Sequence, residues 1–297
     1  MDGRHARLCF GPLLATTLLL FAAPPAVKAQ SGNAIGVTLE YLPDSTLQSE
    51  RGTDDPQEFG YGNIRANLVA PVEIERWNML LLPGASYRLY RPRVDGRIDQ
   101  DGVTTLHDLD LRFGVLKRFG DWSALFNAGF GLATDFRDLE ADHLRYQGLG
   151  VVRYEGSDSW ILGLGGAFTY WFGEPQLLPV AQVIYRGDRW NADLTLPRVA
   201  NVRYLVLDGF EVGGLAQVDG NRFSIGQDLA FESVSLSIAD AGLVAGVKLT
   251  GPIWLTVYGG ATLLRRYDLL DEDNVELLNL DQSPGPIFRL GLVLRPE

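Results

Sequence analysis

The segment WILGLGGAFTYWF, residues 160–172, decides the fold expected of this chain. Its even-numbered residues are large and apolar, with aromatic rings at both ends, whereas most of its odd-numbered residues are small. Successive side chains of a β-strand point to opposite faces of the sheet. One face therefore suits hydrocarbon and the other suits a crowded or wet interior, which is typical of a membrane-spanning strand. A core strand of a soluble sandwich and a buried helix are the alternatives for this segment alone.

The N-terminus has the features of a secretory signal peptide. A basic start with Arg4 and Arg7 precedes an apolar run, and Val27-Lys28-Ala29 forms a small-x-Ala cleavage site. We expect residues 1–29 to be removed and residues 30–297 to form one outer-membrane β-barrel domain. An N-terminal membrane anchor is the alternative, and the short apolar run disfavours it.

The composition excludes several classes of protein. Cys9 lies in the expected signal peptide, so the mature chain has no disulfide and no thiolate metal site. Removal of residues 1–29 takes away three basic residues and one acidic residue, which changes the formal net charge from −11 to −13. An acidic chain of this kind is not expected to bind nucleic acid. After the N-terminus, the sequence has no apolar stretch long enough for a transmembrane helix.

Alternation recurs along the exported chain. In residues 105–117, Leu109, Leu111 and Phe113 share one face, whereas charged residues occupy the other. A short turn at residues 119–121 leads into residues 122–132, whose even-numbered positions are wholly apolar. These segments predict neighbouring antiparallel strands with an apolar outer face.

Fifteen such segments can be counted, and an even number of strands is expected of a bacterial barrel. We therefore expect an all-β, transmembrane, antiparallel up-and-down barrel of about 12–14 strands. The two segments that flank Pro197 are expected to form one strand, because proline is tolerated at a bulge or edge. Asp208-Gly209 and Asp219-Gly220 are expected to be hairpin turns. A change of phase near Asp240 suggests a β-bulge or a turn in residues 234–250.

The polar faces of these strands carry charges of both signs, which suit a lumen with ion pairs and water. A soluble sandwich also alternates, but it does not need such long apolar faces with aromatic residues near their ends. The expected lumen-lining residues are Arg65, Arg88, Asp108, Asp110, Arg112, Arg186, Asp193 and Arg203. The chain departs from the usual barrel pattern at its end, since Leu294-Arg295-Pro296-Glu297 lacks a terminal aromatic residue.

Three stretches carry a resemblance to a known group of proteins. They are LEYLPDS at residues 39–45, DWSALFNAGFGLATDF at residues 121–136 and LLPVAQVIYRGDRWNADLTLP at residues 177–197. The chain resembles the uncharacterised, porin-like outer-membrane β-barrel proteins known only as a domain of unknown function. The resemblance spans most of the mature chain and implies fold and location, with no known catalytic residues.

The sequence offers little sign of catalysis or metal binding. His107 lies on the apolar face of its strand, where a lipid-modifying enzyme would hold a histidine beside a serine. A histidine at the membrane interface without a catalytic role is the favoured interpretation. Acidic residues at 135–142 and 271–273 lack the spacing of a calcium loop, so we expect solvated loops and no metal or cofactor.

These features predict a passive, porin-like channel for small solutes in the outer membrane. If the lumen arginines and aspartates pair, the pore should be narrow or closed. A structural or surface-interaction barrel is the alternative, with acidic outer loops at residues 43–58, 91–102, 134–145 and 268–285. A lipid-modifying enzyme is less favoured. The expected partners are outer-membrane lipids, lipopolysaccharide and the barrel-assembly machinery.

Overall fold

A computed structural model describes residues 35–49, 57–95, 105–137, 143–225, 232–271 and 276–295. These residues form strands and one short 3-10 helix, η1 (Glu75–Trp77). In this part of the chain, no helix is long and apolar enough to cross a membrane. The strands are β1 (Ile35–Ser49), β2 (Gln57–Val69), β3 (Val72–Ile74), β4 (Met79–Asp95), β5 (Leu106–Phe119), β6 (Trp122–Thr134), β7 (Leu144–Tyr154), β8 (Trp160–Thr169), β9 (Gln176–Arg186), β10 (Trp190–Leu196), β11 (Val199–Leu207), β12 (Phe210–Ser224), β13 (Ser233–Thr250), β14 (Ile253–Leu270), β15 (Glu276–Gln282) and β16 (Pro286–Leu294).

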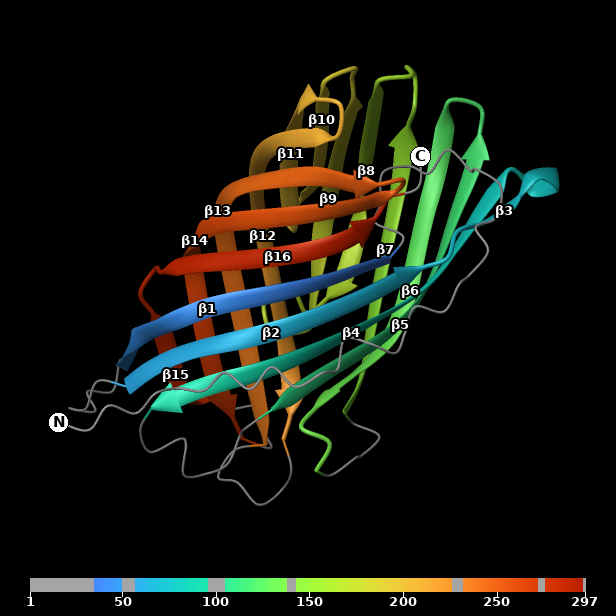
Figure 1. Ribbon diagram of the computed structural model, residues 1–297. Helices are drawn as coiled ribbons and strands as arrows, with labels where there is room; N and C mark the ends of the chain where they lie inside the picture. The colour runs from blue at the N-terminus through green and yellow to red at the C-terminus, as the bar shows by residue number, and fades with distance from the viewer. Residues whose placement is uncertain are drawn as a thin grey trace.

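The strands form one antiparallel sheet that closes on itself (Figure 1). β1 pairs with β2 on one side and with β15 and β16 on the other, and β14 joins β15 and β16 to β13. β2 and β3 pair in turn with the same strand, β4, and are separated at Pro71, which has no N–H to donate. If β2 and β3 are counted as one wall strand, and β15 and β16 as another, the barrel has 14 strands. This confirms the expected fold class.

The outer face of the barrel is apolar, as expected of a wall that contacts lipid. Along β8, Trp160, Leu162, Leu164 and Phe168 are all exposed, and the same alternation occurs on β1, β5, β6 and β16. Pairs of aromatic rings lie at the end with the short turns: Trp122 with Tyr154, Trp160 with Tyr185, and Trp190 with Tyr204. Such a belt of aromatic residues at the edge of an apolar band identifies a transmembrane barrel.

Two turn predictions were wrong. The residues around Pro197 form a tight turn between the antiparallel strands β10 and β11, with a cis Leu196-Pro197 peptide bond, and do not form one strand. Asp219-Gly220 is not a turn, since β12 runs straight through it and pairs with β13 over its whole length. The two errors cancel in the strand count, which is why the predicted number is right although its parts are not.

The predicted change of phase lies on the neighbouring strand. The even-numbered residues of β13 face inward without a change of phase, as Val234, Leu236, Ile238 and Asp240 show. The irregularity lies in β14, where the register changes between Ala239/Leu264 and Asp240/Thr262. Leu263 and Leu264 are both exposed, which is the signature of a bulge that inserts one residue.

The strands differ in length, and this changes the width of the barrel along its axis. β7 to β11 have 7–11 residues each, whereas β12 has 15. β11 pairs with β12 only as far as Gln217, and beyond that point the end of β12 meets β6 directly, Ser224 against Thr134. At the end opposite the short turns, which we call the outer end, the sheet passes directly from β6 to β12 without β7 to β11. Fewer strands therefore close the barrel at this end than at the other, which we call the wide end. A barrel with fewer strands is narrower, and its side chains can fill the interior.

An apolar cluster occupies this narrow outer end. The cluster is Leu42, Tyr61, Tyr90, Leu106, Ala133, Phe223, Ile225, Val234, Leu236, Ile238, Val244, Tyr258, Tyr267, Leu269 and Ile287. Tyr90 of β4 meets Phe223 of β12 edge-to-face, with ring centroids 5.2 Å apart, although these strands are not neighbours. The apolar residues of β13 at this level thus face a core inside the barrel.

The segment at residues 160–172 forms a wall strand only in part. β8 ends at Thr169, and the chain then turns to lie against the outside of β12 and β13. The contact is close, because a Cβ at Gly220 would collide with the Trp171 carbonyl oxygen and a Cβ at Gly173 would collide with the Ser235 side chain. The two glycines let one layer of backbone lie directly on another.

The exposed apolar band predicts that a charged substitution destabilises the barrel more in the middle of the membrane than at its edge. Leu164 is 74% exposed and lies midway between Trp160 and Phe168. We expect Leu164→Arg to lower the free energy of unfolding from lipid vesicles by about 2–4 kcal/mol. Urea unfolding, followed by the heat-modifiable gel shift, measures this change.

Leu207→Arg is the matched control, because Leu207 is 60% exposed but ends β11 beside the short turn. It should cost about 0–1 kcal/mol. Equal costs for both variants would contradict the placement of the band.

Candidate functional site

A group of ion pairs crosses the interior below the apolar cluster. Asp219 of β12 pairs with Arg65 of β2 and, at 2.8 Å, with Arg88 of β4. β12 is not a neighbour of β2 or β4 in the sheet, so these contacts span the space inside the barrel. Arg88 also donates to the Tyr90 hydroxyl, which links the charged group to the apolar cluster above it.

A second set of pairs lines the adjoining wall. Arg145 of β7 lies 2.5 Å from Asp108 and 3.7 Å from Asp110, and Arg112 lies 2.9 Å from Asp110. Asp108 and Asp110 are each 7% exposed. A glycine at position 131 makes the reach from β7 to β5 feasible, because a Cβ there would collide with the Asp110 carboxylate. The Gln147 amide donates a further hydrogen bond to Asp110, at 3.1 Å.

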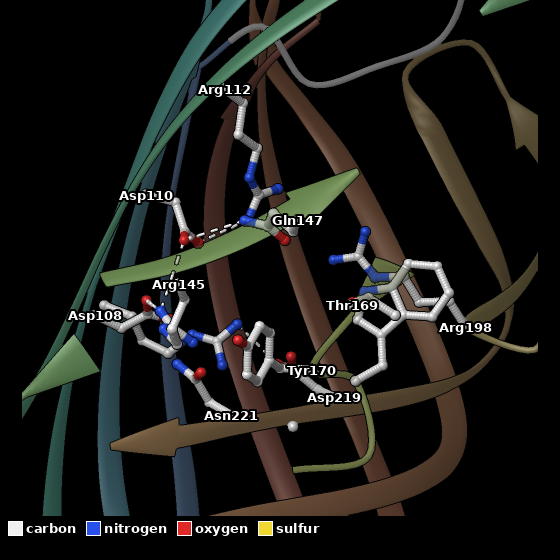
Figure 2. A pocket seen from close by; sticks show the side chains of 13 residues that line it. Asp108, Asp110, Arg112, Arg145, Gln147, Thr169, Tyr170, Arg198, Asp219 and Asn221 are labelled. Carbon is white, nitrogen blue, oxygen red and sulfur yellow. Dashed lines mark hydrogen bonds and ion pairs between the residues drawn. The ribbon is translucent and has the colours of Figure 1, made fainter. Parts of the chain in front are cut away.

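A small cavity of about 40 Å³ lies between these pairs and the segments that follow β8 and β10 (Figure 2). Tyr170 and Trp171, which follow β8, line it together with Arg198 from the β10–β11 turn. The Arg145 guanidinium lies 5.5 Å from the centre of the Tyr170 ring, and that of Arg198 lies 5.3 Å from the Trp171 ring. Cations over aromatic faces at these distances attract the rings.

Arg198 lies in a turn, outside the spanning strands, and its surroundings disfavour the charged form of its guanidinium. Burial lowers the pKa of its guanidinium, and the nearby Arg112 lowers this pKa further. Asp219 acts in the opposite direction, but it already pairs with Arg65 and Arg88.

Further ion pairs lie towards the end with the short turns. Arg289 pairs with Glu40 and, at 2.6 Å, with Asp240, which also accepts a 2.5 Å hydrogen bond from the Tyr258 hydroxyl. Glu211 accepts from Arg203 and, at 2.8 Å, from Arg295. These groups border a second cavity, of about 200 Å³.

The eight expected lumen-lining residues fall into three groups. Five of them meet in the central charged group: Arg65, Arg88, Asp108, Asp110 and Arg112. Arg186 and Asp193 lie 4.0 Å apart on neighbouring strands, away from that group. Arg203 joins Glu211 instead. Whether any of them contacts a permeating solute stays a prediction.

Sequence reasoning missed three charged residues of the central group, Asp219, Arg198 and Arg145. Asp219 was assigned to a turn, Arg198 to the middle of a strand and Arg145 to a loop. One signal was available for Asp219: Leu215, Gln217, Asp219 and Asn221 share one parity, as an uninterrupted strand requires. For Tyr170 and Trp171 no such signal exists, since their turn depends on where distant strands end.

His107 has a partner other than serine. Its Nδ1 lies 2.7 Å from the Tyr87 hydroxyl, and its ring lies 4.7 Å from that of Phe136. Among the described residues, no hydrogen bond between this histidine and a serine is found. Parts of the expected acidic outer loops, residues 50–56, 96–102, 138–142 and 272–275, and the expected signal peptide lie outside the described residues, whereas residues 43–49, 91–95 and 276–282 belong to strands and not to loops.

The architecture places the chain in the class of 14-stranded transmembrane β-barrels, here with an interior filled by charged and apolar side chains. A family model described as a domain of unknown function, DUF6268, matches residues 105–293. This match covers more than half of the chain, so the protein belongs to that family. A comparison with curated protein sequences returned no match.

Several solved barrels are similar in structure. The COG4313 outer membrane channel from Pseudomonas putida F1 is 13% identical, with 93% of this chain and 100% of that chain covered and a TM-score of 0.45. The P. putida toluene transporter TodX is 8% identical, with 90% and 91% covered and a TM-score of 0.40. Outer membrane phospholipase A from Escherichia coli is 12% identical, with 87% and 89% covered and a TM-score of 0.30. These similarities are weak, and the role of this barrel has to be read from its own residues.

The cross-barrel pairs predict a loss of stability when their shared carboxylate is removed. Asp219→Asn leaves Arg65 and Arg88 without their carboxylate, so we expect the free energy of unfolding to fall by about 1–3 kcal/mol. Urea unfolding in vesicles measures it. Asp208→Asn, in the exposed β11–β12 turn, is the control and should change little. A loss no larger than that of the control would show that the pairs do not hold the two walls together.

Proposed function

We propose that this protein is a narrow channel for small polar solutes, held closed in the observed state. The observation that carries the proposal is the central charged group, in which Asp219 joins Arg65 and Arg88 across the interior. Charged side chains on an inner face are costly unless they are paired or meet water. A barrel that served only as a scaffold could fill this level with apolar residues, as it does at the outer end.

The wide end supports the same proposal. A cavity of about 200 Å³ lies inside the barrel and is bordered by Thr38, Asn63, Gln217 and Thr256 among other polar residues. A solute entering there would reach the central charged group next. The apolar cluster beyond it would then be the last barrier, so conduction requires side chains at both levels to move.

We place the barrel in the outer membrane, after export through a signal peptide at residues 1–29. The exposed apolar band supports contact with lipid, and antiparallel barrels with an even number of strands are the form that spans the bacterial outer membrane. Outer-membrane lipids, lipopolysaccharide and the assembly machinery remain the proposed partners.

A structural or surface-interaction barrel is the second candidate, and one observation favours it. Most of the apolar cluster packs together at the outer end, where buried side chains such as Phe223 and Leu42 fill the interior among the described residues. A lipid-modifying enzyme has less support, because the Tyr87 hydroxyl contacts His107 where that chemistry requires a serine.

Planar-bilayer recording of the refolded protein separates the candidates. We expect small, infrequent channel events from the unmodified protein and larger or more frequent ones from Arg65→Ala. That variant removes one cross-barrel contact but leaves Asp219 paired with Arg88, so no carboxylate is stranded.

Arg189→Ala is the matched control, since Arg189 is exposed in the β9–β10 turn. It should behave as the unmodified protein. Absence of channel events at every voltage, both in the unmodified protein and in Arg65→Ala, would refute the channel and leave the structural barrel.

A further inference from the structure

Two small cavities share one set of lining residues. The first, of about 40 Å³, reaches Asp108 and Asp219, and the second, of about 70 Å³, reaches Asn127 and Phe168. Both are lined by Arg112, Gln147, Thr169, Trp171 and Arg198, which we call the arginine–threonine site. Figure 2 shows the guanidinium groups of Arg112 and Arg198 directed toward the same space, with Gln147 and Thr169 beside them.

The charges around this space do not balance. Four arginines, at positions 88, 112, 145 and 198, line it together with three aspartates, at positions 108, 110 and 219, which leaves a surplus of one positive charge. Each aspartate is already in an ion pair. Within the described part of the chain, Arg198 has no carboxylate oxygen within 4.0 Å, and its one charge-related contact is the Trp171 ring. A cation in a restricted space next to another cation favours an anion between them.

Hydrogen-bond donors with no protein partner point to the same ligand. Thr169 is 3% exposed, and its Oγ1 is buried without a hydrogen-bond partner among the described residues. Arg112 Nε is also buried without a partner there. Buried donors are nearly always satisfied, so such atoms around a shared cavity imply a bound species that accepts hydrogen bonds.

We propose that the arginine–threonine site binds a small monovalent anion, of the size of a halide ion or a carboxylate group. Arg198 and Arg112 supply the charge, the Thr169 hydroxyl supplies a neutral donor, and Trp171 holds the Arg198 guanidinium in place. The volume favours a small anion, since one water needs about 10–15 Å³ of cavity measured in this way.

The site lies at the constriction of the proposed channel, but its occupancy does not depend on conduction. An anion can bind there at equilibrium whether or not solutes pass. A binding measurement in detergent can therefore succeed where the bilayer recording fails, and the reverse also holds.

Titration of the purified, refolded barrel with sodium bromide or sodium butyrate tests the proposal. The ionic strength is kept constant with a bulky sulfonate, and tryptophan emission is followed because Trp171 stacks on Arg198. We expect a saturable change with at least one salt. Arg198→Gln should weaken binding by about tenfold to a hundredfold and Thr169→Val by about threefold to tenfold, as loss of a charged and a neutral donor implies. The heat-modifiable gel shift checks that both variants fold.

Arg189→Gln, in the exposed turn at the other end of the barrel, should give the same midpoint as the unmodified protein. Saturation with both salts supports a site for which a free inorganic anion suffices, whereas saturation with butyrate alone supports recognition of the carboxylate of an organic solute. The proposal is overturned if neither salt gives a saturable change, or if folded Thr169→Val and Arg198→Gln both superimpose on the unmodified protein.

Discussion

The number of strands that close the barrel at each level is the constraint on which the rest of the structure depends. Five short strands, β7 to β11, stop before the outer end, and β12 there meets β6 directly. Because fewer strands enclose less space, the same chain forms a wide section and a narrow one. Side chains that would be separated by water in a uniform barrel therefore come into contact. The ion pairs and the aromatic contacts across the interior both follow from this narrowing.

The narrowing also explains why apolar and charged groups share one interior. At the outer end the space is closed by rings and aliphatic side chains such as Tyr90 and Phe223, which need no partners beyond one another. Where the short strands end, the segment with Trp171, which lies over β12, and the turn with Arg198 take the place of the wall. The turn adds the Arg198 guanidinium to the central charged group, in which Asp108, Asp110 and Asp219 are already in ion pairs. The surplus of positive charge is thus a product of topology, because it depends on which strands are short.

Sequence patterns predict the wall of this barrel well and its interior poorly. Alternation is a local property, so the outward apolar faces of β5, β6, β8 and β16 can be read directly, and they suffice for the fold class; the strand number came out right only because two turn errors cancelled. Contacts across the interior join residues distant in sequence, such as Arg65 and Asp219, which are 154 positions apart. Local turn signals even misled, since Asp219-Gly220 and Pro197 were assigned in the reverse of their real roles. The change of phase predicted for residues 234–250 is absent from β13 for a related reason: the pattern takes apolar residues to face lipid, yet Val234 faces a core within the barrel.

If the barrel conducts as proposed, its change of width along the axis would divide an applied voltage unevenly. The wide section, with its cavity of about 200 Å³, would offer little electrical resistance, so most of a potential difference would fall across the narrow outer part. The charges nearest that drop are those of Asp219 and the arginines that pair with it. Moving one elementary charge through 100 mV is worth about 2.3 kcal/mol, which is comparable to the strength of such a pair. In the proposed channel, the change of width would therefore concentrate the electric field on the contacts that hold the two walls together.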